Sequence, residues 1–152
     1  MITFPKDFKE FIQLLHSKKI EYLVIGGYAV GLYGHPRTTG DMDIWVAIHE
    51  NNALKLVEAL HEFGFTSQEI KKDFFLKKAQ IIRMGVPPLR LEIITSIDGV
   101  LFEECYKNKN TVLIENAEVD FISYEDLIKN KKASKRHKDL DDIDHLEKIN
   151  ET

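Results

Sequence analysis

The chain has 152 residues, of which 43% are apolar and 30% are charged. This balance is typical of a folded globular protein and disfavours a disordered or membrane-embedded chain. The length suits one domain, residues 1–152, built around a single core. A formal net charge of −4 also disfavours a protein that binds nucleic acid over its whole surface.

Two further features of the composition concern location. No apolar run approaches the roughly 20 residues that a membrane span needs, and the N-terminus lacks the basic and apolar regions of a secretion signal. The only cysteine, Cys105, cannot form an internal disulfide, which agrees with a reducing compartment. We therefore expect a cytoplasmic protein without membrane contact.

Hydrophobic periodicity and turn-forming residues divide the chain into short elements. In chain order, we predict a helix over 6–18, a strand over 22–25, a short helix over 28–33, a strand over 42–47, a helix over 52–63, strands over 79–84, 89–95, 112–114 and 119–122, and helices over 124–133 and 136–149. Thr66 and Glu69 resemble a capping box for one more short helix, and Ser123 resembles an N-cap. This order predicts a two-layer α+β fold, in which helices cover a mixed sheet and helices 124–149 form a C-terminal extension.

A pair of glycines, Gly26 and Gly27, directly follows the predicted strand over 22–25. Glycine adopts backbone conformations that other residues avoid. The N–H groups of such a turn, and those that open the next helix, can face an anion. An ordinary strand-to-helix turn is the alternative interpretation, so the glycine pair needs support from the rest of the sequence.

Three acidic residues provide that support. Asp41 and Asp43 stand at the start of a predicted strand, where alternation places both side chains on one face, about 7 Å apart at the backbone. Acids this close repel each other unless a cation lies between them, and carboxylates with phosphate oxygens are the usual ligands of Mg²⁺. Glu92 lies within an apolar strand, where burial is costly without a partner or a metal. The alternatives are a solvated strand end for the two aspartates and a salt bridge to Arg83, Arg90 or a lysine for Glu92.

These residues resemble the nucleotidyltransferase superfamily related to DNA polymerase beta, whose pattern is Gly-Gly-x-Ala and then G-x-x-R-x-T-x-D-x-D. The chain reads Gly26-Gly27-Tyr28-Ala29, then Gly34-His35-Pro36-Arg37-Thr38-Thr39-Gly40-Asp41-Met42-Asp43. It is most similar to small bacterial nucleotidyltransferases of the abortive-infection, toxin–antitoxin type. In that branch the third acid is usually Asp in a strand before a T-S-x-x-G turn. Here Glu92 reaches one methylene further and precedes Thr95-Ser96-Ile97-Asp98-Gly99.

A second motif extends the resemblance to the C-terminal segment, over about 22–146. Relatives carry L-I-x-x-K and then R-x-K-D-x-x-D-I-x-x-L; the chain has Leu127-Ile128-Lys129-Asn130-Lys131, then Arg136-His137-Lys138-Asp139-Leu140-Asp141-Asp142-Ile143-Asp144-His145-Leu146. Taken alone, the basic residues can face a triphosphate or form a solvated helix surface. The motif favours Lys131, Arg136 and Lys138 over Lys132 and Lys135 as nucleotide contacts.

The resemblance implies transfer of a nucleoside monophosphate from an NTP, such as ATP, to an acceptor hydroxyl, with release of pyrophosphate. It assigns Asp41, Asp43 and Glu92 to catalysis and to two Mg²⁺ ions, and it allows Glu92 to accept the proton. The residues that it assigns to the nucleotide are Gly26, Gly27, Arg37, Thr39, Lys131, Arg136 and Lys138.

The acceptor and the biological role stay open at this point. The acceptor can be a tRNA, a protein or a small molecule. The chain can act in a toxin–antitoxin or phage-defence system, as an antibiotic nucleotidyltransferase, since lincosamide-modifying enzymes share the Gly-Gly start and D-x-D, or as a catalytically degenerate nucleotide-binding module. No second substrate domain is evident, so we expect a small helical partner protein or a homodimer to help bind the acceptor.

The histidines show no spacing typical of a metal site. His35 lies in the loop before Asp41 and has no ligand partner nearby in the sequence. His137 and His145 are too far apart along one helix for a zinc pair. We therefore interpret His35 as an ordinary loop residue, with a base or a contact to the substrate as the alternative.

Overall fold

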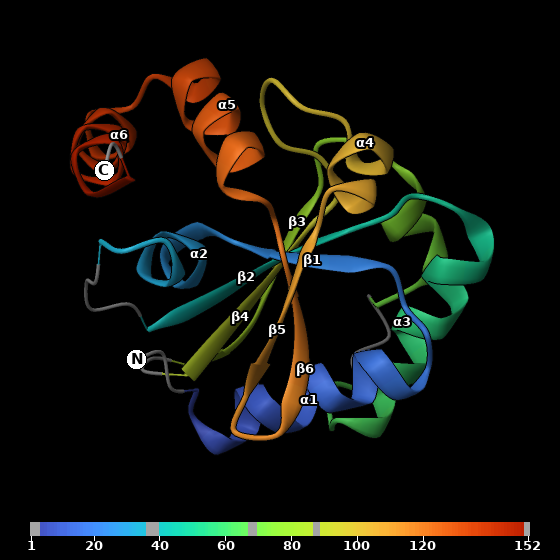
Figure 1. Ribbon diagram of the computed structural model, residues 1–152. Coiled ribbons are helices and arrows are strands. Elements are labelled where there is room, and N and C mark those ends of the chain that lie inside the picture. Colours follow the sequence, from blue (N-terminus) through green and yellow to red (C-terminus); the bar gives the residue numbers. More distant parts are fainter. Residues whose placement is uncertain (1–3, 36–39, 67–69, 87–88, 151–152) are drawn as a thin grey trace.

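The computed structural model describes residues 4–35, 40–66, 70–86 and 89–150. Its elements, in chain order, are α1 (Lys6–Ser17), β1 (Tyr22–Ile25), α2 (Gly26–Leu32), β2 (Asp41–Val46), α3 (Glu50–Glu62), the 3-10 helix η1 (Lys72–Leu76), β3 (Ile81–Val86), β4 (Leu89–Ile94), α4 (Phe102–Lys107), β5 (Asn110–Ile114), β6 (Ala117–Phe121), α5 (Tyr124–Ser134) and α6 (His137–Asn150). Figure 1 shows a twisted central sheet with helices packed around it.

The sheet has the strand order β3-β4-β2-β1-β6-β5. β1 pairs with β2 in antiparallel and with β6 in parallel orientation. β2 pairs with β4 in parallel, and the hairpins β3–β4 and β5–β6 complete the two edges. The predicted α+β class with a mixed sheet covered by helices is confirmed.

Burial along the strands follows their hydrophobic sequence. All four residues of β1 are buried, as expected for a strand with a neighbour on each side. In β2, the buried Met42 and Ile44 alternate with the partly exposed Asp41 and Asp43. Since successive side chains point to opposite faces of a sheet, both aspartates lie on the same face, as predicted.

Helix α1 supplies one side of the core. Its buried residues are Phe8, Phe11, Ile12 and Leu15, which recur at the spacing of a single helix face. Burying each of these side chains contributes about 1.5–3 kcal/mol relative to exposure. α1 contacts both β6 and α3, so this hydrophobic face anchors the helices that support the sheet.

Two helices were not predicted. α4 spans only six residues; Phe102, Cys105 and Tyr106 do recur at helical spacing, but so short a segment gives no clear period. Its Phe102 ring packs edge-on against Trp45 with centroids 5.1 Å apart, so a tertiary contact stabilises it. The 3-10 helix η1 was missed as well. The capping box predicted at Thr66 and Glu69 lies partly outside the described residues.

The predicted N-cap at Ser123 is confirmed. The Ser123 side chain accepts a hydrogen bond from the Asp126 N–H at 3.1 Å and begins α5. α5 ends at Lys135, whose φ of +56° turns the chain into α6. This turn brings the two C-terminal helices together, and they contact each other. In the described part of the chain, no helix is both long and apolar enough to cross a membrane.

Candidate active site

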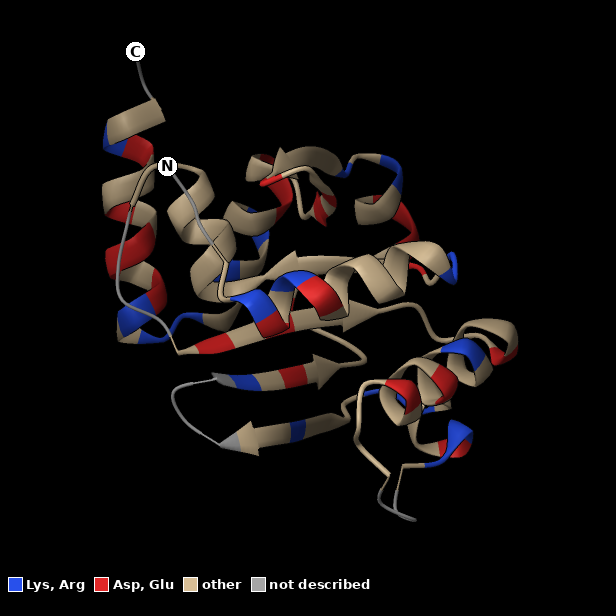
Figure 2. Cartoon of the chain, turned by 90° about the horizontal axis from the view of Figure 1, so that it is seen from below, with Lys and Arg blue, Asp and Glu red and all other residues tan. Residues whose placement is uncertain are grey.

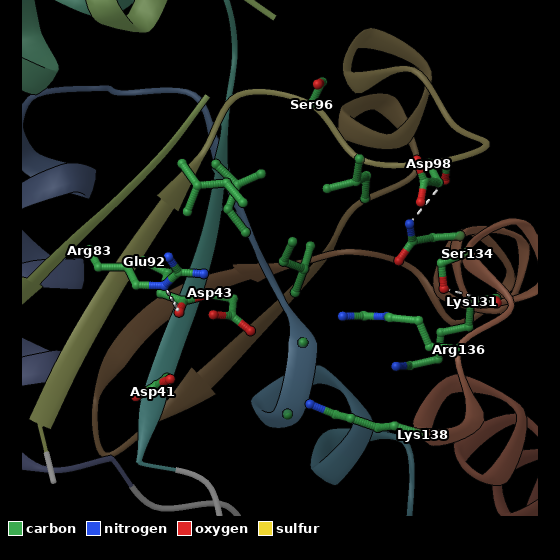
Figure 3. A pocket seen from close by; sticks show the side chains of 17 residues that line it. Asp41, Asp43, Arg83, Glu92, Ser96, Asp98, Lys131, Ser134, Arg136 and Lys138 are labelled. Atoms are coloured by element: carbon green, nitrogen blue, oxygen red, sulfur yellow. Dashed lines mark hydrogen bonds and ion pairs between the residues drawn. The ribbon is translucent and has the colours of Figure 1, made fainter. Parts of the chain in front are cut away.

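The register of three strands brings the acidic residues together. Asp43 lies opposite Ile25 of β1 on one side and opposite Glu92 of β4 on the other. Because β2 and β4 are parallel and Asp43 and Glu92 are direct partners, both carboxylates leave the same face of the sheet at the same height. Figure 3 shows the two side chains next to each other, with Asp41 close by.

Two arginines accompany these acids. Arg90 Nη2 lies 2.9 Å from Asp41 Oδ2, and its Nε donates to Asp41 Oδ1 at 3.2 Å. Arg83 Nε donates to Glu92 Oε1 at 2.8 Å. Charged residues lie on each of the three adjacent strands β2, β4 and β3 (Figure 2). The predicted salt bridge of Glu92 is therefore present at one of its oxygens. Glu92 nevertheless also belongs to the acidic cluster, because it lies opposite Asp43.

The Asp43 carboxyl has a strongly perturbed pKa. Burial, hydrogen bonding to Glu92 and the charges of Glu92 and Asp41 raise the pKa of the Asp43 carboxyl to about 7, while Lys138 acts in the opposite direction. Asp43 Oδ1 is buried and has no hydrogen-bond partner in the described part of the chain. A buried carboxylate oxygen without a partner, beside a second carboxylate, is a suitable ligand for a divalent cation.

The glycine pair lies directly against this cluster. Gly26 has a φ of +68°, and a Cβ at this position would overlap the Asp43 carboxylate. The residue therefore has to be glycine for two reasons, the backbone conformation and the space that Asp43 takes. Gly26 and Gly27 also open α2, so backbone N–H groups lie beside the carboxylates.

The basic residues approach from the opposite side, where α5 meets α6 (Figure 3). The side chains of Arg136 and Lys138 extend from there towards the acidic cluster. The Lys138 ammonium forms no ion pair within the described ranges, and it is close enough to lower the pKa of Asp43. Lys132 and Lys135, the two lysines outside the motif, are largely exposed, and Lys132 pairs with Glu147 at 3.9 Å.

Lys131 has different partners from those expected. Only 4% of the residue is exposed, and its ammonium lies 3.1 Å from Asp139 Oδ1 and 2.9 Å from Asp142 Oδ2. These contacts join α5 to α6. Lys131 is therefore committed to a buried ion-pair network, although it borders the same cavity as Arg136 and Lys138.

Asp139 is the centre of this network. In addition to Lys131, it accepts hydrogen bonds from Arg136 Nε at 2.7 Å and from the Ser134 hydroxyl. Burial opposes ionisation, but the hydrogen bonds from Arg136, Ser134 and Lys131 hold the pKa of the Asp139 carboxyl well below its usual range. The network fixes the turn between α5 and α6, and it thereby fixes where Arg136 and Lys138 point.

The turn after β4 closes a third side of the site. A Cβ on Gly99 would lie 2.5 Å from the Cβ of Ala133 in α5, so this glycine permits a close approach of turn and helix. The Asn130 side chain donates to the backbone carbonyl of Asp98 at 2.9 Å. The Thr95–Gly99 motif thus packs against α5 and forms a wall of the site.

These walls enclose an open cavity of about 540 Å³. Asp41, Asp43 and Glu92 lie at one end with Arg83, and the basic residues Lys131, Arg136 and Lys138 lie at the other, where Asp98 also borders the cavity. Its lining residues are Ile25, Gly26, Gly27, Asp41, Asp43, Ile81, Arg83, Glu92, Ile94, Ser96, Ile97, Asp98, Asn130, Lys131, Ser134, Arg136 and Lys138. The volume is sufficient for a nucleotide-sized ligand.

Most of the residues predicted from the sequence meet in this cavity. The exceptions are Arg37 and Thr39, which lie outside the described residues. Sequence reasoning did not identify Asn130 and Ser134 as lining residues, nor the isoleucines Ile81, Ile94 and Ile97. Alternation in β3 and β4 could have found two of them, since Ile81 stands two residues from Arg83 and Ile94 two residues from Glu92.

The comparisons with known proteins agree with this arrangement. The sequence model of the aminoglycoside-2''-adenylyltransferase family matches residues 7–149. No curated protein matches the chain by sequence.

Solved structures with a similar fold include three nucleotidyltransferases or proteins like them. A putative nucleotidyltransferase from Thermotoga maritima is 20% identical, with 95% of this chain and 91% of that one covered and a TM-score of 0.58. An antigenic nucleotidyltransferase-like protein from Paracoccidioides brasiliensis is 19% identical, with coverages of 97% and 78% and a TM-score of 0.55. The lincosamide antibiotic adenylyltransferase LnuA, solved with lincomycin bound, is 16% identical, with coverages of 97% and 98% and a TM-score of 0.57.

At these identities the structural matches establish the fold, while the family match covers almost the entire chain. Together with the Gly-Gly turn beside paired carboxylates, they show that this protein belongs to the aminoglycoside-2''-adenylyltransferase family and is a nucleotidyltransferase.

Proposed function

We propose that the protein transfers a nucleoside monophosphate, with ATP as the donor, to a hydroxyl group of an acceptor. The acceptor oxygen attacks the α-phosphorus, the bond from that phosphorus to the bridging oxygen of the β-phosphate breaks, and pyrophosphate leaves. The observation that carries this proposal is the in-register pair Asp43 and Glu92, which faces Arg136 and Lys138 across one cavity.

The acidic end of the cavity is suited to Mg²⁺. Asp41, Asp43 and Glu92 would hold it, since oxygen ligands from carboxylates and phosphates are those that Mg²⁺ prefers. Bound there, Mg²⁺ neutralises the triphosphate and lowers the pKa of the attacking hydroxyl. Glu92 would accept the proton of the acceptor, because its side chain borders the cavity beside Asp43.

The basic end is suited to the triphosphate. Lys138 and Arg136 would neutralise the negative charge of the phosphates, and backbone N–H groups at Gly26 and Gly27 would donate hydrogen bonds to phosphate oxygens. Lys131 supports these contacts indirectly, by holding α6 against α5. Arg37 and Thr39 remain predicted nucleotide contacts on the basis of the sequence motif.

The chemical class of the acceptor distinguishes an antibiotic nucleotidyltransferase from an enzyme of a toxin–antitoxin system. The family match and the similarity in fold to LnuA favour a small-molecule antibiotic as acceptor. A tRNA or protein acceptor would instead fit a toxin–antitoxin role, with a helical partner protein or a second copy of the chain.

An acceptor screen tests the proposal. The protein is incubated with α-labelled ATP, Mg²⁺ and, in separate reactions, lincosamides, aminoglycosides, bulk tRNA and cell protein. Transfer of label that is lost in Asp43→Asn supports nucleotidyl transfer, and the labelled class identifies the acceptor. ATP binding without transfer to any class would favour the degenerate nucleotide-binding module, and absence of ATP binding would contradict the proposal.

A further inference from the structure

A group of metal-ligating side chains lies outside the active-site cavity, where the end of α2 meets α6. His35 follows α2, while Asp141 and His145 lie one turn apart on α6. One ligand atom from each of the three residues lies within 4.8 Å of the other two. We propose that His35, Asp141 and His145 bind a divalent transition-metal ion, with Zn²⁺ as the representative.

The hydrogen bonding of His145 supports a role as ligand. Its Nδ1 lies 2.9 Å from the backbone carbonyl oxygen of Asp141. Because a carbonyl only accepts, this nitrogen carries the proton and Nε2 keeps the lone pair in the neutral ring. An imidazole that donates its other N–H to a backbone carbonyl is the usual arrangement of a metal-binding histidine.

The surrounding charge also favours a cation. His35 Nε2 lies 4.0 Å from Asp141 Oδ2 and 3.7 Å from Asp142 Oδ1. The Asp142 side chain is 1% exposed, and its other oxygen is held by Lys131. Two carboxylates therefore face the imidazole edge, and the buried one is fixed in place.

The ligand set selects the class of metal. Two imidazoles and one carboxylate suit Zn²⁺ and similar transition metals, whereas Mg²⁺ and Ca²⁺ prefer all-oxygen sites. A tetrahedral ion with bonds of about 2.1 Å holds its ligand atoms ~3.4 Å apart, so the three side chains must approach one another slightly. The rings of His35 and His145 stack at 4.1 Å, so the His35 ring has to turn out of the stack about χ2 for both nitrogens to point to one ion, while His145 keeps its hydrogen bond to the Asp141 carbonyl. His145 and Asp141 are 45% and 64% exposed, which leaves room for this adjustment and for entry of the ion.

The experiment uses Zn²⁺ itself and removes two of the three competing active-site carboxylates. Asp41→Asn/Asp43→Asn disables the active-site acids, and Zn²⁺ binding to this background is measured by calorimetry with a competing chelator. We expect one Zn²⁺ per chain and a higher thermal midpoint with Zn²⁺. Adding His145→Asn or Asp141→Asn should lower the affinity at least tenfold, whereas adding the matched control His61→Asn, an exposed histidine of α3, should not.

A direct readout identifies the ligands. In proton NMR, the ring signals of His35 and His145 should shift on addition of Zn²⁺, while those of His61 should not. Equal affinity in the His145→Asn and His61→Asn variants would overturn the proposal, and so would the absence of binding in the background variant or equal binding of Mg²⁺. Circular dichroism of each variant establishes that a loss of binding is not a loss of fold. The proposal is independent of the nucleotidyl transfer proposed above, so either can fail alone.

Discussion

The Asp43 carboxylate occupies the space that a Cβ on Gly26 would need. Gly26 of α2 and Asp43 of β2 therefore fit closely against each other, although they belong to different elements. The absence of a side chain at Gly26 leaves room for the carboxylate on the sheet face beside Glu92, and it explains why the turn and the acids occur together in one site.

We predict that Gly26→Ala abolishes nucleotidyl transfer and destabilises the fold by about 1–3 kcal/mol, because the methyl group displaces Asp43 and the φ of +68° is strained for alanine. Urea unfolding and the label-transfer assay measure the two effects. Gly64→Ala is the matched control. Gly64 also has a positive φ, +110°, but a Cβ there meets nothing within 4 Å. It should lose stability and keep its activity; equal loss of activity in both variants would show that backbone strain alone is responsible.

A second prediction concerns pH. The native pKa of Asp43 is about 7, compared with an ordinary value of 3.8, so between these values the native state binds more protons than the unfolded state. The free energy of unfolding contributed by this group therefore falls as pH rises from about 4 to about 7. Asp43→Asn should remove this decrease and, at pH 8, should be more stable than the original chain by at least about 1 kcal/mol, while transfer activity is lost.

Urea titrations at pH 5 and pH 8, without added metal, measure this effect. Glu58→Gln, an exposed acid of α3, is the control and should leave the pH dependence unchanged. If Asp43→Asn shows the same fall in stability between the two pH values as the original chain, the perturbed pKa is not that of Asp43.

The third prediction separates the roles of the basic residues. Lys138→Gln and Arg136→Gln should each weaken ATP binding several-fold, with a larger effect at low salt, where charges are screened least. The double variant Lys132→Gln/Lys135→Gln removes two charges from exposed positions of the same region. Fluorescence titration with a labelled ATP analogue compares them. A similar loss in the control would mean that the effect comes from diffuse charge.

Lys131 should behave differently from these residues. Lys131→Met leaves the buried carboxylates of Asp139 and Asp142 without their shared cation, which costs about 3–5 kcal/mol. The variant should therefore unfold at markedly lower urea concentration. Lys132→Met, one position along the helix and exposed, should change stability by less than about 0.5 kcal/mol. If Lys131→Met remains as stable as Lys132→Met and loses only ATP affinity, Lys131 is a direct phosphate contact.

The last prediction is a ligand effect on stability. Mg²⁺ with ATP should raise the thermal midpoint by several degrees, since a ligand that binds only the native state stabilises it by mass action. Mg²⁺ alone should give part of the increase, because it relieves repulsion among three clustered acids. The comparison of wild type with Asp41→Asn/Asp43→Asn in a thermal scan tests this, and an equal increase in both would place the ligand elsewhere.

The sequence by itself determined the local features of this protein. Alternation in a strand is a property of consecutive residues, so the spacing of Asp41 and Asp43 is sufficient to put them on one face. The order of elements, the N-cap at Ser123 and the glycine turn depend in the same way on neighbours in the chain. The short helix α4 was not predicted from the sequence, because its stability comes from the contact of Phe102 with Trp45 and not from local propensity.

Only the tertiary structure decided which distant residues meet. The register of β2 against β4 sets Glu92 opposite Asp43. The left-handed backbone conformation of Lys135 reverses the chain, so that Asp139 and Asp142 of α6 form ion pairs with Lys131 of α5. Sequence spacing left His35 without a partner, yet the packing of α6 brings His145 onto its ring. Such pairings depend on how whole elements pack, because many separate hydrophobic contacts fix the position of each helix, and no local pattern in the sequence records the result.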